Sequence, residues 1–282
     1  NAIDMANSNE DVATIVLDGA GKAFVAGADV KFFVDKIKAD SFPDIYDFTA
    51  DGHVVLNKLE DSSKTTIALT TGLSLGGGLE LALSCDYRIG TRKTQFRFPE
   101  TSIGIFPGLG GTQRPARISG IPAARWAVLA GNFMDSQTAA DLGLVTDLVD
   151  VTEVDSTINK LSKLGKPAEK YPGTPANADS PVVKFANSFY SDENLPTLIE
   201  GNCPEGFDSE DKLVARQLRS LSRTAPIALQ MASDLIDAAA ETSLKQGLSQ
   251  ELDNLEKIFS TSDALEGLSA LIEGRKPTYQ NS

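Results

Sequence analysis

Short apolar runs and amphipathic stretches alternate along the first half of the chain. The runs Val12–Leu17 and Lys64–Leu69 end in turn residues and are too short for a buried helix, so they predict strands. Ile45–Leu59 instead has its apolar residues at helical spacing. The same criteria predict further strands over Asp86–Thr91, Gln95–Phe98 and Leu144–Val149, further helices over Asp29–Ile37, Gly76–Cys85, Pro122–Ala130 and Ser136–Leu142, and a turn over Phe24–Ala28. We therefore expect an α/β fold with a largely buried sheet.

The pattern changes after about Asp150, where the strand signal ends. Lys163–Pro181 contains four prolines and predicts an exposed loop or linker. Beyond two short apolar islands, helices are predicted over Asp208–Ser222, Pro226–Glu241, Ser243–Phe259 and Asp263–Gly274. The chain therefore divides into an α/β core (1–150), an insertion or linker with short helices (151–225) and a helical C-terminal region (226–282).

Composition and charge narrow the class of protein. Hydrophobic residues make up 41% of the 282 residues, enough for a substantial core, yet no apolar run reaches the roughly 18 residues of a membrane span. The net charge of −13 disfavours nucleic-acid binding. The chain opens at Asn1 without a methionine, in what resembles a helix, so we expect the native polypeptide to begin earlier. We expect a cytoplasmic location.

The cysteines and the single histidine indicate no metal or disulfide. Cys85 lies in an apolar run and Cys203 in a loop, and neither belongs to a Cys-x-x-Cys pair. His53 cannot form a multi-histidine site alone, and no Gly-x-Ser-x-Gly motif accompanies it for a catalytic triad. We expect His53 to be structural or a solvated helix residue.

Three glycines, Gly76-Gly77-Gly78, open the helix predicted over Gly76–Cys85. The first N–H groups of a helix have no internal partner and carry the positive end of its dipole. Without a Cβ, glycine lets a carbonyl come within hydrogen-bond distance, where an enolate oxygen would be stabilised. Taken alone, the same glycines also fit a turn made for close strand–helix packing.

Two glutamates are candidates for proton transfer. Glu80 lies in the first turn of that helix among leucines and an alanine, where a carboxylate is at least partly buried and needs a partner or a function. Glu100 follows Pro99 at the end of a predicted strand, a common place for a catalytic group. Singly, each also fits an ordinary charge at a helix start or on the surface. Together, the two could act as base and acid on one water.

Four ordered motifs resemble those of the crotonase superfamily, and within it the enoyl-CoA hydratases. They are Gly21–Lys31, Leu75–Ala82, Phe98–Thr101 and Pro107–Arg114. The resemblance covers most of residues 12–150 and returns in the C-terminal helices. It implies a core that is a spiral of ββα turns, and a helical C-terminal region that drives trimer formation, with hexamers as dimers of trimers.

The resemblance also implies a reaction and a site. The reaction is the addition of water to a trans-2-enoyl-CoA in fatty-acid β-oxidation, giving a 3-hydroxyacyl-CoA, with coenzyme A thioester as substrate and no metal or other cofactor. The implied catalytic groups are the oxyanion-hole N–H groups of Ala28 and Gly77, the water-activating Glu80, the Cα-protonating Glu100 and the water-positioning N–H of Gly108. The implied substrate-binding residues are Ala26, Asp29, Lys31 and Phe106.

Other activities within the superfamily remain as alternatives. An isomerase or hydrolase commonly keeps only one of the two glutamates, whereas this chain has Glu80 and Glu100. The 3-hydroxyisobutyryl-CoA hydrolases share extra sequence like residues 164–222 but carry an acidic residue where this chain has Gly108. A non-catalytic acyl-CoA-binding subunit is the other alternative. An RNA-binding relative is disfavoured by the charge of −13.

Three features depart from a simple hydratase. The chain begins later than the family does, residues 164–222 are longer than usual, and Gly274 stands where the family often has a lysine. The first two resemble fusions in which a hydratase domain follows an NAD-dependent 3-hydroxyacyl-CoA dehydrogenase domain. We therefore expect such a domain upstream, although no Gly-x-Gly-x-x-Gly lies within these residues.

Overall fold

Two four-stranded sheets form the centre of the computed structural model, which describes residues 1–282. The first has the order β1-β3-β5-β8 and is parallel throughout: β1 (Thr14–Asp18), β3 (Thr65–Thr70), β5 (Tyr87–Gly90) and β8 (Asp147–Leu148). The second has the order β2-β4-β6-β7: β2 (Ala23–Val25), β4 (Leu73–Leu75), β6 (Gln95–Arg97) and the antiparallel β7 (Met134–Asp135). The first six strands therefore alternate between the two sheets.

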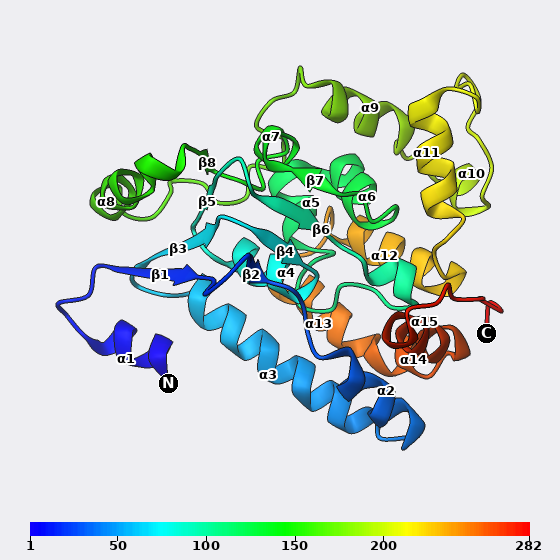
Figure 1. Cartoon of the computed structure of the whole chain (residues 1–282), viewed down its shortest axis with the longest axis horizontal. Coiled ribbons are helices and arrows are strands. Elements are labelled where there is room, and N and C mark those ends of the chain that lie inside the picture. Colours follow the sequence, from blue (N-terminus) through cyan, green and yellow to red (C-terminus); the bar gives the residue numbers. More distant parts are fainter.

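Helices follow each pair of strands, and the chain winds as a spiral of ββα turns (Figure 1). The first pair leads to α2 (Val30–Lys38) and α3 (Phe42–Glu60), the second to α4 (Gly77–Ser84), and the third to the 3₁₀ helix η1 (Glu100–Ile103). β3 is almost completely buried, as expected for a parallel strand covered on both faces. The predicted α/β fold class with a crotonase-like spiral is confirmed.

α3 has a buried face whose spacing explains its formation. Pro43 sits in its first turn, where a missing N–H costs nothing. The buried residues recur every three or four positions: Ile45, Thr49, His53, Leu56 and Leu59. This face packs toward α4 and the C-terminal helices, and it brings His53 into the interior.

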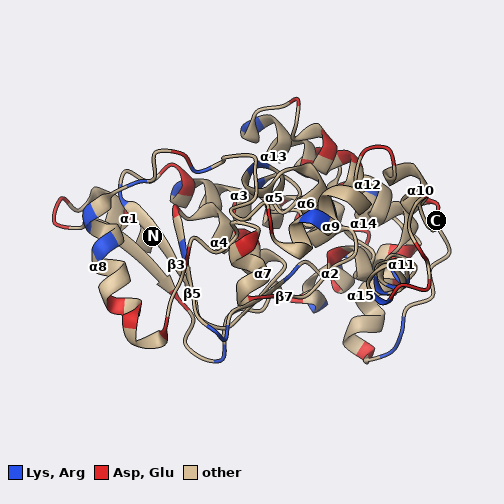
Figure 2. Ribbon diagram, turned by 90° about the horizontal axis from the view of Figure 1, so that it is seen from above, with Lys and Arg blue, Asp and Glu red and all other residues tan.

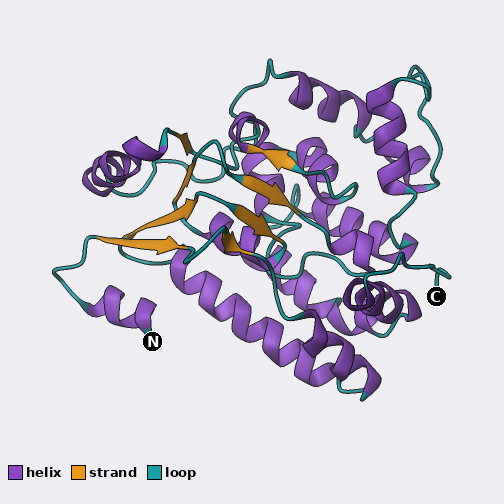
Figure 3. Cartoon of the chain, viewed as in Figure 1, coloured by secondary structure: helices purple, strands orange, loops and turns teal.

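The remaining helices cover the sheets and extend to both sides of them (Figure 3). Those before residue 165 are α1 (Ala2–Ser8), α5 (Arg114–Ser119), α6 (Ile121–Val128), α7 (Ser136–Asp141), the 3₁₀ helix η2 (Val151–Glu153) and α8 (Val154–Leu164). Those after it are α9 (Pro181–Phe189), α10 (Leu195–Ile199), α11 (Lys212–Leu221), α12 (Pro226–Ala238), α13 (Leu244–Asp253), α14 (Leu255–Phe259) and α15 (Ser262–Glu273). None of the helices combines the length and apolar character that crossing a membrane requires.

The C-terminal helices return to the start of the chain. α13 and α14 pack against α3, and α15 packs against α2 and η1 (Figure 1). Phe259 of α14 stacks on Phe33 of α2, with ring centroids 5.2 Å apart. Side chains from the end of the chain therefore complete a pocket whose other walls come from residues 26–109.

Residues 165–222 pack on the core through α9 and α11. Val183 and Phe189 of α9 are buried in the same hydrophobic cluster as Trp126 of α6. The buried amide of Gln217 on α11 exchanges hydrogen bonds with Asn132 and accepts one from the Tyr190 hydroxyl. The exposed loop predicted over Lys163–Pro181 does separate α8 from α9.

Several boundaries predicted from the sequence are wrong. The predicted turn over Phe24–Ala28 begins as strand β2, which pairs with β4, itself too short to give a periodic signal. Only Asp147–Leu148 of the predicted strand Leu144–Val149 pairs with β5, because the N–H groups of Leu144 and Val145 both donate to Ala139 and complete the end of α7.

The predicted helix Ser243–Phe259 is broken into α13 and α14 at Asn254, whose side chain donates to the Gln250 carbonyl and competes with the backbone ladder. The helix α8 (Val154–Leu164) was not predicted. Figure 2 colours the acidic and basic residues along the ribbon, and most of them lie on the outer helices and loops. Both cysteines are free, and Cys85 is buried as expected of a core residue.

Candidate active site

Three neighbouring parallel strands end at one edge of the second sheet and bring the predicted site segments together. Val25 pairs with Ser74, and Leu75 pairs with Arg97, so the residues after β2, β4 and β6 emerge side by side. Gly78 lies against β2 so closely that a Cβ there would be 2.1 Å from the Val25 carbonyl oxygen. Only glycine permits this approach, which sets the start of α4 beside the segment Ala26–Ala28.

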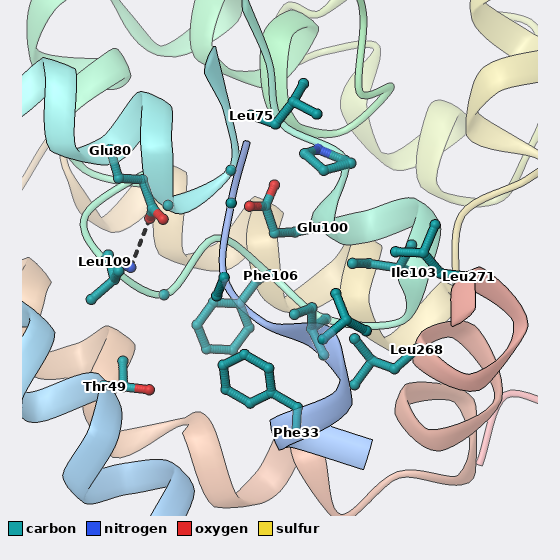
Figure 4. A pocket seen from close by; sticks show the side chains of 18 of the residues that line it. Phe33, Thr49, Leu75, Glu80, Glu100, Ile103, Phe106, Leu109, Leu268 and Leu271 are labelled. Carbon is teal, nitrogen blue, oxygen red and sulfur yellow. Dashed lines mark hydrogen bonds between the residues drawn. The ribbon is translucent and has the colours of Figure 1, made fainter. Parts of the chain in front are cut away.

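A cavity of about 310 Å³ opens at this edge (Figure 4). Its polar end is formed by Ala26–Ala28, Gly76, Gly77, Glu80, Pro99, Glu100 and Gly108. Its apolar end is formed by Val30, Phe33, Phe48, Ile103, Ile105, Phe106, Leu255, Phe259, Leu268 and Leu271. Such a mixture of a large apolar lining and a few convergent polar groups is typical of a ligand site.

Glu80 is held from one side by the backbone of a glycine-rich loop. Its Oε1 accepts hydrogen bonds from the N–H groups of Leu109 and Gly111, each at 2.7 Å. The side chain is 2% exposed. Burial raises the pKa of Glu80 to about 7, although the two N–H donors and the Arg114 charge act in the opposite direction. At neutral pH this carboxyl group is therefore divided between its ionised and protonated forms.

Glu100 has no comparable partners. Its Oε2 is buried and accepts no hydrogen bond, and the whole residue is buried. Burial raises the pKa of Glu100 well above its usual value, and the charge of Glu80 raises it further. Glu80 and Glu100 extend from opposite sides into the same space in Figure 4. The pair therefore favours a state with Glu100 protonated and Glu80 ionised.

Gly76 makes room for the Glu100 carboxyl group. Its φ of +48° lies in the left-handed region, and a Cβ at this position would be 2.2 Å from Glu100 Oε1. A side chain here would be strained and would also collide with the carboxyl group. The glycines at the start of α4 thus serve two approaches: Gly78 to the β2 backbone and Gly76 to Glu100.

Three backbone N–H groups at the cavity remain available for a ligand. Ala28 and Gly108 lie in loops, line the cavity, and donate to no atom of the chain. Gly77 is the first residue of α4, where an N–H has no acceptor in the preceding turn of helix. These donors match what an oxyanion and a polarised water require.

The loop Gly108–Thr112 is held by more residues than the sequence predicts. Glu251 of α13 accepts hydrogen bonds from the N–H groups of Gly110, at 2.6 Å, and Thr112, at 3.1 Å. His53 Nε2 lies 2.7 Å from the Gly108 carbonyl oxygen. Neither Glu251 nor His53 was a predicted site residue, and His53 is buried rather than solvated.

A signal for Glu251 does exist in the sequence. It lies on the helix face that also carries Leu248 and Leu255, so a carboxylate falls at an apolar position, and Glu251 is fully buried. The same signal singled out Glu80. The partner of Glu251 could not be predicted, because the contact joins α13 to a loop far away in the sequence.

Most of the predicted site residues meet at the cavity. Ala26, Ala28, Gly77, Glu80, Glu100, Phe106 and Gly108 all line it. Asp29 and Lys31 do not, and both are exposed. Asp29 caps α2 by accepting a hydrogen bond from the Lys31 N–H, and the Lys31 side chain pairs with Asp35.

The fold and the cavity define a class: a crotonase-fold protein with two buried carboxyl groups facing free backbone N–H donors. Comparison with known sequences agrees. A profile of the enoyl-CoA hydratase/isomerase family matches residues 1–282. A protein of Mycobacterium tuberculosis named as a probable enoyl-CoA hydratase is 30% identical over 97% of this chain and 82% of its own length. A mitochondrial protein of Dictyostelium discoideum with the same name is 29% identical over 100% of this chain and 79% of its own length.

Solved structures share the fold. An enoyl-CoA hydratase from Rhodobacter sphaeroides superposes with a TM-score of 0.82, 22% identity, and coverage of 99% of this chain and 82% of its own. A carnitinyl-CoA dehydratase from Mycobacterium thermoresistibile gives a TM-score of 0.81, 20% identity, and coverage of 99% and 81%. The chain belongs to the enoyl-CoA hydratase/isomerase family.

Proposed function

We propose that this chain is an enzyme, an enoyl-CoA hydratase that adds water to a trans-2-enoyl-CoA to give a 3-hydroxyacyl-CoA. The observation that carries the proposal is the pair of buried carboxyl groups with unlike surroundings at one cavity. Glu80 accepts two N–H bonds, whereas Glu100 Oε2 accepts none. A hydratase needs this difference, since one group must take a proton from water while the other gives one to carbon.

The proposed reaction begins at the thioester carbonyl. Its oxygen accepts hydrogen bonds from the N–H groups of Ala28 and Gly77, which stabilise the enolate as negative charge develops. Ionised Glu80 takes one proton from a water that the Gly108 N–H orients, and the water oxygen bonds to C3. Protonated Glu100 then gives its proton to C2. The apolar end of the cavity, including Phe106, encloses the acyl chain and excludes bulk water.

The coenzyme A part of the substrate needs its own surface. We place its nucleotide end over Ala26, Asp29 and Lys31, at the cavity mouth and on the adjoining exposed start of α2. No cofactor beyond the thioester substrate takes part in this scheme. Lys31→Ala should raise KM for an enoyl-CoA and leave kcat unchanged, because the contact is remote from the reacting atoms.

The organisation of the polypeptide is also part of the proposal. We retain the division into 1–150, 151–225 and 226–282, with the last region forming a trimer interface. Leu271 and Ile272 of α15 are each 51% exposed, which supports a further contact there. Sedimentation analysis should give a trimer or hexamer, and a monomer at all concentrations would contradict this.

A fusion to an upstream dehydrogenase domain remains a proposal. A peroxisomal fatty acid β-oxidation multifunctional protein of Arabidopsis thaliana is 37% identical over 55% of this chain, which corresponds to 21% of its own length. The intact mass of the protein purified from its native source tests the point. A native mass near 30 kDa would argue against the fusion.

The decisive experiment is hydration of crotonyl-CoA, followed as the loss of ultraviolet absorbance by the conjugated thioester. Wild-type protein should hydrate crotonyl-CoA, and Glu80→Gln should do so at least about 100-fold more slowly. An isomerase that uses Glu100 alone would survive this substitution when assayed with a 3-enoyl-CoA. Tight thioester binding without turnover of either substrate would instead indicate a binding subunit.

A further inference from the structure

The loop Gly108–Thr112 lies between two buried carboxylates that divide its N–H groups in alternation. Glu80 of α4 accepts from Leu109 and Gly111, and Glu251 of α13 accepts from Gly110 and Thr112. The Thr112 hydroxyl also donates to Glu251 Oε1, at 2.5 Å. Four successive N–H groups are therefore engaged, and only the first of the five, that of Gly108, is left facing the cavity.

Two consecutive peptide units of this loop are fixed at both ends. The Gly108–Leu109 unit accepts from His53 at its oxygen and donates to Glu80 at its N–H. The Leu109–Gly110 unit accepts from Arg114 Nη1 at its oxygen, at 2.8 Å, and donates to Glu251 at its N–H. A peptide unit held at both ends cannot rotate without breaking a buried hydrogen bond.

The protonation state of His53 is consistent with this role. A carbonyl oxygen can only accept, so Nε2 must carry the proton that contacts Gly108. Burial lowers the pKa of His53 to about 4, which keeps the ring neutral at physiological pH. Its Nδ1 is buried without a partner, so the side chain is bound through this one hydrogen bond.

We infer that Glu251, assisted by His53, is a positioning residue for the water-activating half of the site. This inference rests on the proposed function. Glu251 holds the N–H groups of Gly110 and Thr112, and this keeps the loop in the position where Leu109 and Gly111 bind Glu80. Glu80 and the free Gly108 N–H then contact one water. Glu251 does not line the cavity and therefore acts only through the loop.

The unfavourable free energy of burying the Glu251 carboxyl group supports a role beyond packing. The side chain is fully buried, and burial together with the Glu80 charge raises the pKa of Glu251 to about 8. The three hydrogen bonds that Glu251 accepts favour its ionised form, so holding that form beside Glu80 and away from water costs free energy at neutral pH. Groups arranged against stability in this way are typical of functional sites.

Glu251→Gln tests the inference because it keeps the shape of the side chain. The amide has one oxygen and would set an NH₂ group against a loop N–H, so one side of the loop is released. We expect kcat for crotonyl-CoA hydration to fall roughly 10- to 100-fold, as a displacement of about 1 Å at a reacting group does. KM should stay nearly unchanged, because the N–H groups of Ala28 and Gly77, which donate to the thioester carbonyl oxygen, lie outside this loop.

A matched control separates positioning from the loss of any buried carboxylate. Asp86 is also buried and accepts a backbone N–H, that of Thr66 at 2.9 Å, but it lies outside the cavity. Asp86→Asn should leave kcat and KM unchanged in the folded protein. A second pair, Thr112→Val and Thr112→Ser, removes or keeps the hydroxyl that donates to Glu251. Thr112→Val should lower kcat several-fold, and Thr112→Ser should restore it.

Amide hydrogen exchange gives a readout that does not depend on turnover. Exchange at Gly110 and Thr112 should accelerate in Glu251→Gln and remain slow in Asp86→Asn. Unchanged exchange, or an unchanged kcat in folded Glu251→Gln, would overturn the inference. If Glu251→Gln does not fold, the Thr112 pair decides in the same way. A wild-type protein without hydratase activity would overturn the proposed function instead, and exchange would then decide whether Glu251 holds the loop.

Discussion

The two walls of the cavity treat their carboxyl groups differently. The donor wall consists of Glu80 and the loop Gly108–Thr112, where the backbone supplies two N–H bonds to one carboxylate oxygen. The acid wall consists of Pro99, Glu100 and Ile103, where Glu100 Oε2 is buried without a partner. N–H donors stabilise the ionised form, whereas an environment without donors stabilises the neutral form. One cavity can therefore hold a base and an acid that are both glutamates.

The protonation state of each glutamate depends on its neighbours rather than on its residue type. Both side chains are buried, and burial raises the pKa of both. The pKa of Glu80 is limited to about 7 by its donors, while that of Glu100 lies well above its usual value.

Removing either carboxyl group should have the largest effect. Glu80→Gln and Glu100→Gln should each lower kcat for hydration by about 10²- to 10⁴-fold, the usual contribution of a positioned acid or base. Thioester binding should persist in both, because the oxyanion donors are backbone groups. Steady-state kinetics with crotonyl-CoA, together with binding measured by calorimetry, checks this. A near wild-type rate in either variant would show that its carboxyl group transfers no proton.

A steric change at the acid wall should have the next largest effect. Gly76→Ala would bring a Cβ to 2.2 Å from Glu100 Oε1 at a residue with φ of +48°, so both the carboxyl group and the start of α4 must shift. We expect kcat to fall roughly 10- to 100-fold. Gly21→Ala is the matched control, since no atom lies within 4 Å of the Cβ it would add. Equal activity of the two variants would contradict the close fit of Glu100.

Much of the fold follows from local patterns. The strand β1 follows from a compact apolar run with turn residues nearby, and α3 from buried residues that recur at helical spacing; β3 and β5 overlap the predicted strands Lys64–Leu69 and Asp86–Thr91. β2 and β4 were missed, since three residues give only a weak periodic signal, although the equally short β6 was predicted over Gln95–Phe98. Their identity as strands depends on pairing with each other, which is a tertiary property.

The site could be predicted only in part from single residues. Glu80 was notable as a charge among apolar residues, but its nearness to Glu100 came from the family resemblance rather than from spacing. Glu251 gave the same local signal and was missed, because nothing in the sequence links α13 to the loop Gly108–Thr112. Positive φ at Gly76 likewise becomes visible only in three dimensions.

The pKa of Glu80, on the donor wall, should appear in the pH dependence of the hydration rate. In the proposed mechanism, hydration requires ionised Glu80, whose pKa is about 7, and protonated Glu100, whose pKa lies well above its usual value. The rate kcat/KM should therefore fall about tenfold per pH unit below about pH 7, and fall again at higher pH as Glu100 ionises. Circular dichroism at each pH controls for unfolding. An acid limb near pH 4 would mean that Glu80 is solvated in the working enzyme.

The smallest effect, on stability, distinguishes the acid wall from an ordinary buried ion pair. Because the pKa of Glu100 is raised on folding, the folded state binds more protons than the unfolded state, so the free energy of unfolding falls as pH rises above about 5. Glu100→Gln should therefore raise Tm by about 2–4 °C at pH 8, and by much less near pH 5.

Glu60 is the opposite case: burial raises its pKa, but the charges of Arg114 and Lys170 outweigh burial and hold the net pKa below its usual value. Glu60→Gln should lower Tm at pH 8, since its charged form contributes stability above its unfolded pKa. Thermal denaturation of both variants at the two pH values makes the test. If Glu100→Gln were also destabilising at pH 8, Glu100 would have to be a structural carboxylate with a partner, and the contrast between the two walls would fail.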